Sequence, residues 1–531
     1  MAASIEQKMR AYIPNRITIG KEKAGMRIRT YLKNAVLLTA AGFALRVLGM
    51  VFRVYIAGWL GGEGMGLYQL ILAVYAVFTA LATAGVNVAS TKLAAQSLAR
   101  GRGMAPTLWG LVSAAACFGT LAMLAQVALA EPVAHWMLHD ARAELGLRIL
   151  APSLPFMAVA GALRGCFLAR RRVEPNVTSQ MIEQLVRMAV AAFALSRLAA
   201  WGAGYACGAV LLGNTVSEAV SCLLMVLFAR REPVFRPQPG DPARGFTRRE
   251  LFGIALPVCG SRLLASGLQA IESSLIPLCL TLYMGERAAA VTQYGAVKGM
   301  AMPLIFFPFS VLAALSGLLM PEIARAGARR DQAAQAELIH TAMTLTGLFS
   351  VLAGAGLVLF GKPLAMLLYH EKSVGQYMRV LGFIAPFMYL ESMVDGILKG
   401  MGEQMATFWY SILDSALRIL AMSVLIPRYG MAGFLAVMAA SNLLTCTLNL
   451  HRMLHCAVMK PDWAAWFILP AAVAGIGLTP VLWLRRFLPD AAWSLGAEMA
   501  AFALGAGIPL LLAWRKNKTA LVRLGTGRSK S

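Results

Sequence analysis

Long runs of apolar residues alternate along the chain with short polar segments that are rich in Lys and Arg. Each run reaches about 20 residues, the length that a helix needs to cross a hydrocarbon core of about 30 Å. Such runs indicate helices rather than strands, because a helix satisfies its own backbone hydrogen bonds in lipid. The fourteen predicted spans lie at approximately residues 34–58, 67–90, 106–130, 149–169, 177–199, 204–229, 251–282, 291–320, 338–361, 380–399, 406–426, 431–455, 464–484 and 491–514.

The composition agrees with an all-α polytopic membrane protein. Of 531 residues, 59% are apolar and 14% are charged, against about 45–50% and about 25% in an average soluble domain. These values exclude a cytosolic enzyme, a disordered scaffold and a secreted disulfide protein. The eight cysteines mostly lie inside apolar runs, which is typical of small core residues.

The charge is strongly basic, with 49 Lys and Arg, 25 Asp and Glu and a net charge of +24. A nucleic-acid-binding domain would gather its basic residues in one folded patch. Here they lie in short loops, as the positive-inside rule predicts. If the N-terminus is cytoplasmic, the cytoplasmic segments hold 32 Lys and Arg and the external loops hold 10. We therefore predict a cytoplasmic-membrane protein with both termini in the cytoplasm and no nucleic-acid partner.

An internal repeat divides the chain. The longest polar stretch between spans, Arg230–Glu250, follows the sixth span. Equivalent spans are six apart, so the two halves face the same way, as parallel repeats do. Pro152, Arg164-Gly165, Glu183 and Arg187 in the first half correspond to Pro386, Lys399-Gly400, Asp414 and Arg418 in the second. The predicted units are a basic cytoplasmic arm (1–33), an N-lobe of six helices (34–229), a linker (230–250), a C-lobe of six helices (251–456), and two further helices with a basic tail (457–531).

Two arginines on the first span, Arg46 and Arg53, are the main candidates for substrate binding. A separation of seven residues is two helical turns, which places both on one face about 10 Å apart. A charge near the middle of the membrane costs about 2.5–3.5 kcal/mol, so each needs a partner or a water-filled cavity. Guanidinium groups bind phosphate oxygens bidentately, so the pair suits a diphosphate. The alternative is snorkelling, or pairing with Glu183 or Glu218 on neighbouring helices.

Further charges lie inside other spans. Arg262 on the seventh span is a candidate third arginine of the cluster, or a partner of Glu272. Lys298 on the eighth span is a candidate phosphate contact or an interface anchor.

Two pairs, Glu183 with Arg187 and Asp414 with Arg418, have the i,i+4 spacing of an ion pair within one helix. We predict that these pairs are structural. Glu272, Asp395 and Asp414 are candidate sites for Na⁺ or H⁺ that would couple transport to an ion gradient.

Recognised catalytic motifs do not occur in the sequence. It contains neither a nucleotide-binding P-loop nor a nucleophile motif. We therefore expect a transporter rather than an enzyme, without a metal or a cofactor other than a coupling ion.

The first two spans carry a family resemblance. The stretch Leu45-Arg46-Val-Leu-Gly49-Met-Val-Phe-Arg53, followed by Gly61-Gly-Glu-Gly-Met-Gly66-Leu-Tyr68-Gln69, resembles the polysaccharide flippase and stage V sporulation protein B group. That group belongs to the multidrug/oligosaccharidyl-lipid/polysaccharide (MOP) exporter superfamily and is related to the lipid II flippase. The resemblance implies a V-shaped, pseudo-twofold transporter with a cationic cavity between two six-helix bundles. Arg46 and Arg53 match first-helix arginines of the lipid II flippase, although they are seven rather than six residues apart, and Arg262 matches by helix alone.

The expected function is translocation of an undecaprenyl-diphosphate-linked oligosaccharide or peptidoglycan precursor by alternating access, in spore cortex, cell-wall or polysaccharide synthesis. The expected partners are this lipid-linked glycan and membrane lipids, and the chain is expected to act as a monomer. Two alternatives stay open: a cation-coupled multidrug exporter, and a non-transporting scaffold for envelope synthesis.

Overall fold

The computed structural model describes residues 14–83, 85–100, 104–236, 245–487 and 494–507. Every regular element in these ranges is a helix. The described residues contain ten helical segments that are long and apolar enough to cross a membrane. The chain is therefore an all-helical, multi-pass membrane protein, as predicted. The ten segments are Ala40–Ala99, Met104–Met137, Arg142–Ala169, Ala203–Arg231, Arg248–Met284, Arg287–Ala313, Gln332–Tyr369, Lys372–Gly400, Gln404–Ala457 and Ala464–Leu484.

Two of these segments turn back on themselves. Helix α2 (Pro14–Thr83) bends at Gly61, where φ is 62°, and α14 (Gln404–Ala457) bends at Gly430, where φ is 59°. Glycine adopts this left-handed conformation without the steric cost that a Cβ imposes. A straight helix of 60 residues would be about 90 Å long, three times the hydrocarbon core. Each bend falls between two runs that the sequence predicts as separate spans.

The described helices also differ from the predicted spans. The predicted fifth span corresponds to α7 (Glu174–Leu198), which is not among the ten segments because it carries several charged residues. Residues 494–507 are helical and fall within the predicted fourteenth span.

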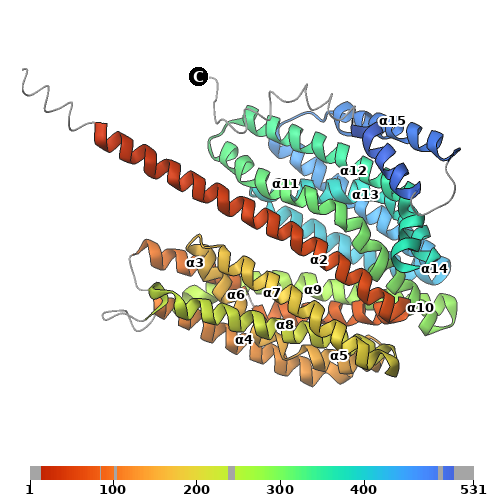
Figure 1. Ribbon diagram of the computed structural model, residues 1–531, viewed down its shortest axis with the longest axis horizontal. Coiled ribbons are helices and arrows are strands. Elements are labelled where there is room, and N and C mark those ends of the chain that lie inside the picture. The colour runs from red at the N-terminus through yellow and green to blue at the C-terminus, as the bar shows by residue number, and fades with distance from the viewer. Residues whose placement is uncertain (1–13, 84, 101–103, 237–244, 488–493, 508–531) are drawn as a thin grey trace, which may run out of the picture.

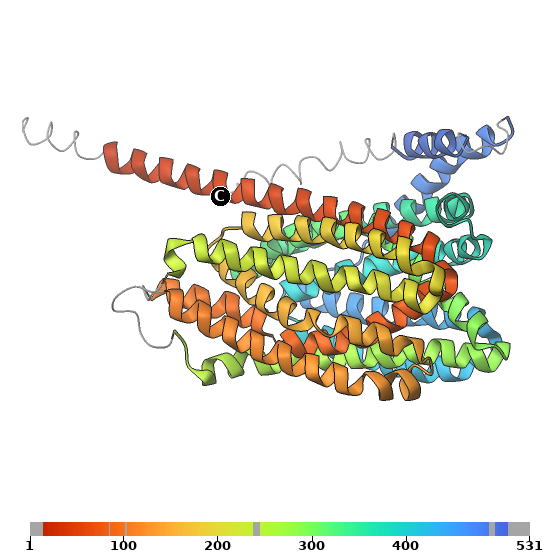
Figure 2. The ribbon, with the colours of Figure 1, turned by 60° about the horizontal axis from the view of Figure 1, so that its bottom comes forward.

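The first helix starts much earlier than the predicted first span. Helix α2 begins at Pro14 and passes without a break through most of the predicted arm. Proline suits the first turn of a helix, where its missing N–H group would have no partner. Figures 1 and 2 show this part of α2 extending beyond the other helices. Residues 1–13 of the predicted arm and 508–531 of the predicted tail lie outside the described residues.

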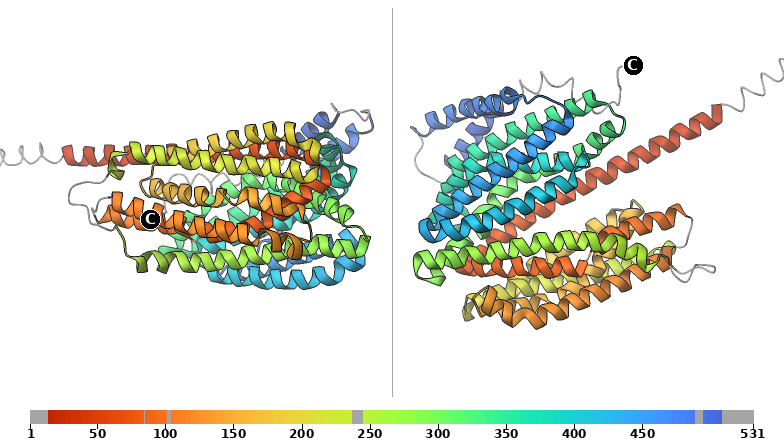
Figure 3. Two further views of the ribbon diagram at one scale, coloured as in Figure 1. Left: turned by 90° about the horizontal axis from the view of Figure 1, so that it is seen from below. Right: turned by 180° about the vertical axis from the view of Figure 1, so that it is seen from behind.

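The remaining helices lie in two groups, with α2 between them (Figures 1 and 3). The groups meet near α10 (Arg287–Tyr294) and diverge toward the opposite end, so that the helices form a V. The first group contains α3 (Val86–Ala99), α4 (Met104–Pro132), α5 (Arg142–Leu150), α6 (Ser153–Ala169), α7 and α8 (Ala203–Arg231). The second contains α11 (Met302–Ala328), α12 (Gln332–Tyr369), α13 (Lys372–Gly400), α14 and α15 (Leu469–Leu484).

Helix α9 (Arg248–Met284) contacts both groups. Its first turn is fixed by a capping box, in which the Thr247 hydroxyl accepts the Glu250 N–H at 3.2 Å and the Glu250 carboxylate accepts the Thr247 N–H at 2.7 Å. Near this end, Ala255 belongs to an apolar cluster formed with the first group. At the other end, Tyr283 lies against Gly430 of α14.

The meeting point of the two groups, here called the Gly61 end, consists of residues 61–66, 138–142 and 285–295. A Cβ atom on Gly66 would overlap the carbonyl oxygen of Val291 and lie 2.7 Å from Val291 Cγ1. Glycine therefore allows the α2 backbone to approach α10 directly. At the same end, Arg142 forms ion pairs with Glu63 at 2.7 Å and Asp140 at 2.8 Å.

Candidate functional site

A cavity of about 410 Å³ lies between α2 and α11. On α2 its wall follows the spacing i, i+3, i+4, i+7, which is one face of a helix. On α11 its wall is formed by one proline, three phenylalanines and one serine. The lining residues are Arg46, Gly49, Met50, Arg53, Pro303, Phe306, Phe307, Phe309 and Ser310. Both predicted arginines thus face the same space, and none of the described residues that line it is a carboxylate.

Most hydrogen-bond donors of the two arginines are not used by the protein. Arg46 Nη1 donates one hydrogen bond to the Ser310 carbonyl oxygen at 3.0 Å, which joins α2 to α11. A guanidinium group has five N–H donors. Within the described part of the chain, Arg53 forms neither a hydrogen bond nor an ion pair. The cavity therefore presents permanent positive charge and free donors beside aromatic rings.

The other two candidate phosphate contacts do not line this cavity. Arg262 is exposed on α9, and among the described residues it has no ion-pair partner. Lys298 lies on the π-helix η4 (Gly295–Ala301), 4.0 Å from Glu272 Oε1 and 5.8 Å from the ring centre of Phe434. Glu272 thus pairs with Lys298 and not with Arg262.

Lys298 belongs to a cluster that we call the C-lobe network: Glu272, Lys298, Asp414 and Arg418. Arg418 lies 3.3 Å from Glu272 and 3.3 Å from Asp414. Asp414 also accepts a hydrogen bond from the Ser441 hydroxyl at 2.7 Å. Glu272 and Asp414 are both buried. The network holds two cations and two carboxylates, so it is neutral when all four groups are ionised.

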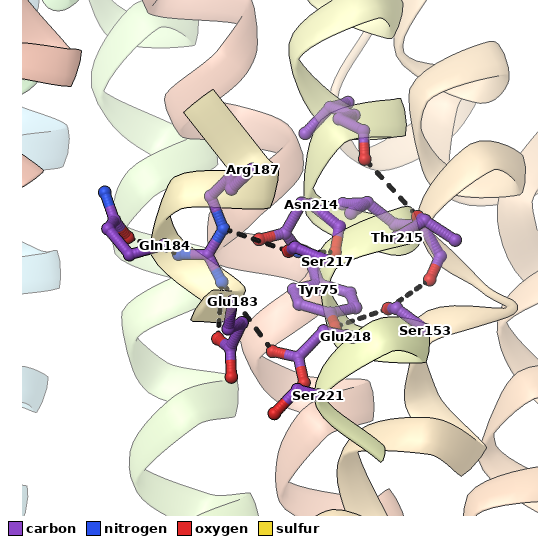
Figure 4. Close-up of polar contacts among 12 residues, drawn as sticks. Tyr75, Ser153, Glu183, Gln184, Arg187, Asn214, Thr215, Ser217, Glu218 and Ser221 are labelled. Carbon is purple, nitrogen blue, oxygen red and sulfur yellow. Dashed lines mark hydrogen bonds and ion pairs between the residues drawn. The ribbon is translucent and has the colours of Figure 1, made fainter. Parts of the chain in front are cut away.

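A second cluster in the first group, the N-lobe network, consists of Arg164, Glu183, Arg187 and Glu218 (Figure 4 shows all but Arg164). Glu183 accepts hydrogen bonds from Arg164 and Arg187 at 2.7 Å each, one on each carboxylate oxygen. Glu218 Oε1 lies 3.9 Å from Arg187. This network also holds two cations and two carboxylates, and its partners come from α6, α7 and α8.

Two further intramembrane acids, Glu391 and Asp395, lie on α13. Asp395 pairs with Lys399 at 2.5 Å. Glu391 accepts a hydrogen bond from Asn449 at 3.4 Å. The three candidate ion-coupling residues, Glu272, Asp395 and Asp414, therefore each have a cationic partner in the protein. No group of three or more potential metal ligands occurs among the described residues.

Sequence reasoning missed the opposite wall of the cavity. Phe306, Phe309 and Ser310 belong to the run Met302–Ser310, in which two prolines and three phenylalanines fall within nine residues. This density of prolines and aromatic rings inside a span was the available signal. Nothing in the sequence indicated that this segment would face Arg46.

Comparisons with known proteins agree with this architecture. The sequence pattern of the polysaccharide biosynthesis protein family matches residues 31–326, more than half of the chain. Stage V sporulation protein B of Bacillus subtilis (strain 168) is 27% identical over 444 residues, which cover 82% of this chain and 84% of that protein. Lipid II flippase MurJ of the same organism is 22% identical over 402 residues, which cover 70% and 73%.

Solved structures share the fold. Lipid II flippase MurJ in an inward closed conformation aligns with a TM-score of 0.70 and 12% identity, covering 91% of this chain and 99% of that one. An inward-facing multidrug resistance MATE family transporter of the MOP superfamily aligns with a TM-score of 0.62 and 14% identity, covering 80% and 100%. The chain belongs to the polysaccharide biosynthesis protein family.

Proposed function

We propose that this protein is a flippase that carries a lipid-linked glycan precursor, bound through its diphosphate, across the cytoplasmic membrane. The supporting observation is the cavity that Arg46 and Arg53 line without a carboxylate. A charge held near mid-membrane costs about 2.5–3.5 kcal/mol. A pyrophosphate headgroup offsets that cost, because its oxygens accept hydrogen bonds from both guanidinium groups.

The distribution of the other intramembrane charges supports the same proposal. The two networks pair their arginines and Lys298 with carboxylates inside each lobe. Arg46 and Arg53 are therefore available to an anionic ligand. A cavity with this charge repels cationic drugs, so we do not propose multidrug export.

The proposed mechanism is alternating access across fourteen membrane crossings. With both termini in the cytoplasm, the Gly61 end is external, and close packing of Gly66 against Val291 seals it. The cavity then opens toward the cytoplasm, where the precursor is made. Rocking of the two six-helix bundles moves the headgroup to the outside while the lipid chain stays in the bilayer. The inside-negative potential favours outward movement of anionic charge, by about 2.3 kcal/mol per charge per 100 mV.

The names of the relatives indicate the substrate class. One is a lipid II flippase and another is a sporulation protein. We therefore propose an undecaprenyl-diphosphate-linked glycan or peptidoglycan precursor, moved by a monomer that performs no covalent chemistry. Use in sporulation, as in the 27% identical relative, is part of this proposal.

The test is translocation of a fluorescent lipid-linked precursor in reconstituted vesicles. A hydrogen bond to a charged group contributes about 1.5–3 kcal/mol. We therefore expect Arg46→Ala and Arg53→Ala each to reduce translocation at limiting substrate by about tenfold or more. Arg379→Ala is the matched control, because Arg379 is exposed on α13 and does not line the cavity. Unchanged translocation in both cavity variants would refute the site, and no translocation by the wild type would favour a scaffold.

A further inference from the structure

The two carboxylates of the N-lobe network have unequal partners. Glu183 has an arginine at 2.7 Å on each of its oxygens. Glu218 has Arg187 at 3.9 Å from Oε1, beyond hydrogen-bond distance. Its other oxygen, Oε2, is buried and accepts no hydrogen bond from any described residue. Because only 7% of Glu218 is exposed, solvent supplies little of the missing stabilisation.

Three hydroxyl groups near Glu218 donate their hydrogen bonds to other acceptors (Figure 4). On α8, the Ser217 hydroxyl donates to the Asn214 carbonyl oxygen at 2.8 Å. The hydroxyl groups of Tyr75 on α2 and Ser153 on α6 are 2.6 Å apart, and Ser153 donates to the Leu150 carbonyl oxygen at 2.5 Å. Ser153 has a single hydroxyl proton, so Tyr75 must donate to Ser153.

The charged neighbours on the other helices do not compensate Glu218 either. Arg164 on α6 binds Ser221 at 2.6 Å and Glu183. Glu183 on α7 is negative and disfavours a second negative charge beside it. Arg187, also on α7, donates from each of its three nitrogens to another residue, namely Glu183, Gln184 and Ser217.

A buried carboxylate without hydrogen bonds is costly as an anion and inexpensive as a neutral acid. We propose that Glu218 is a proton-binding site, and that its proton is coupled to occupancy of the cavity. The proton comes from water and binds the unpartnered Oε2. Protonation changes the N-lobe network from neutral to a net charge of +1, while both arginines stay charged.

The cavity and this network share one helix. Helix α2 carries Arg53 in the cavity wall and packs against α7 and α8, which carry Arg187 and Glu218. An added positive charge on the network therefore favours an anion beside Arg53. By linkage, a bound anion must favour protonation of Glu218 to the same degree. This coupling rests on the proposed function, whereas the proton site itself does not.

The first experiment detects the proton without any substrate. Infrared spectra of the full chain in lipid nanodiscs are recorded across the neutral pH range, and the carbonyl band of protonated carboxyl groups is followed. Wild type should show a component that disappears at alkaline pH and is absent from Glu218→Gln and Glu218→Leu. Retention of the full band in both variants would overturn the proton site, even if translocation is normal.

Glu232→Gln is the matched control. Glu232 lies just after α8, where burial opposes its ionisation but hydrogen bonds and charge from Arg170 and Arg172 lower its pKa overall. Glu232 is therefore ionised at neutral pH, and its removal should leave the carboxyl band unchanged.

The second experiment measures the coupling, with inorganic pyrophosphate as the probe. Calorimetric titrations in two buffers of different ionisation enthalpy give the protons taken up on binding. Proton uptake by Glu218→Gln is subtracted from proton uptake by wild type, which cancels the protons that pyrophosphate itself gains or loses. We expect wild type to take up a further fraction of a proton and to bind several-fold more weakly at alkaline pH, with both effects lost in the variant. Binding with identical proton uptake in both proteins would overturn the coupling, and absence of binding would instead contradict the proposed function.

Discussion

The contact between Gly66 and Val291 predicts that Gly66→Ala opens the Gly61 end. A Cβ at residue 66 meets the Val291 carbonyl oxygen, which belongs to helical backbone and cannot rotate away. Overpacking of this kind costs about 1–3 kcal/mol. The strain exists only in the conformation in which residues 66 and 291 are in contact. It therefore shifts the equilibrium between the closed and open forms of the Gly61 end toward the open form, by about 5- to 150-fold.

The measurement is a pair of spin labels across the Gly61 end, at Trp136→Cys and Leu282→Cys. Both positions are highly exposed, at 82% and 71%, and they lie on the first group and on α9. Cys117 and Cys456 are replaced by serine, because the other six cysteines are buried. We expect Gly66→Ala to transfer population to a longer distance between the labels.

Gly58→Ala is the matched control for this experiment. Gly58 also lies in α2, but a Cβ there meets nothing within 4 Å. Both substitutions raise helix propensity by a similar amount, so they differ mainly in the contact with Val291. An unchanged distance distribution in Gly66→Ala, or an equal change in Gly58→Ala, would show that this contact does not hold the Gly61 end closed.

Three further predictions concern stability, measured by thermal unfolding in detergent. Glu272→Gln removes the buried carboxylate that pairs with half-buried Lys298 and Arg418 and should cost about 3 kcal/mol. Glu322→Gln, in an exposed pair, should cost about 1 kcal/mol or less. Equal losses would contradict the network. Ser310→Ala should change stability by less than about 0.5 kcal/mol. Arg46 binds the backbone carbonyl oxygen of residue 310, and the Ser310 hydroxyl has no hydrogen-bond partner among the described residues. A large loss of stability would show that the hydroxyl does form a stabilising contact. Hydrogen bonds from the Ala465 N–H, and to a smaller extent with His340, lower the pKa of Asp462 below its ordinary value of 3.8. The stability that ionised Asp462 contributes is therefore present at neutral pH and is lost as the pH falls through the lowered pKa. The difference between wild type and Asp462→Asn should therefore vanish in strong acid, and a difference that persists there would exclude an ionic origin.

Much of the fold follows from short-range pattern. The apolar runs predict membrane helices because hydrophobic length and backbone hydrogen bonding leave few other solutions. The positions of Arg46 and Arg53 on one face of α2 follow from the helical repeat alone. The bends at Gly61 and Gly430 fall where the sequence has a polar interruption.

The partners across helices do not follow from such patterns. Arg164 meets Glu183 from a different helix, and Lys298 meets Glu272. These contacts depend on how helices rotate against one another, which one sequence does not specify. The sequence also did not predict that α2 begins at Pro14. An apolar run locates the part of a helix that crosses the membrane, whereas the helix itself can extend beyond that run.

The hydrogen bond from Arg46 to the Ser310 carbonyl oxygen joins α2 to α11, so the two walls of the cavity cannot part unless it breaks. Under the proposed function, a pyrophosphate bound by the Arg46 guanidinium would replace this carbonyl oxygen as acceptor. Substrate binding would then free the two helices to separate, and without substrate the hydrogen bond would oppose their separation.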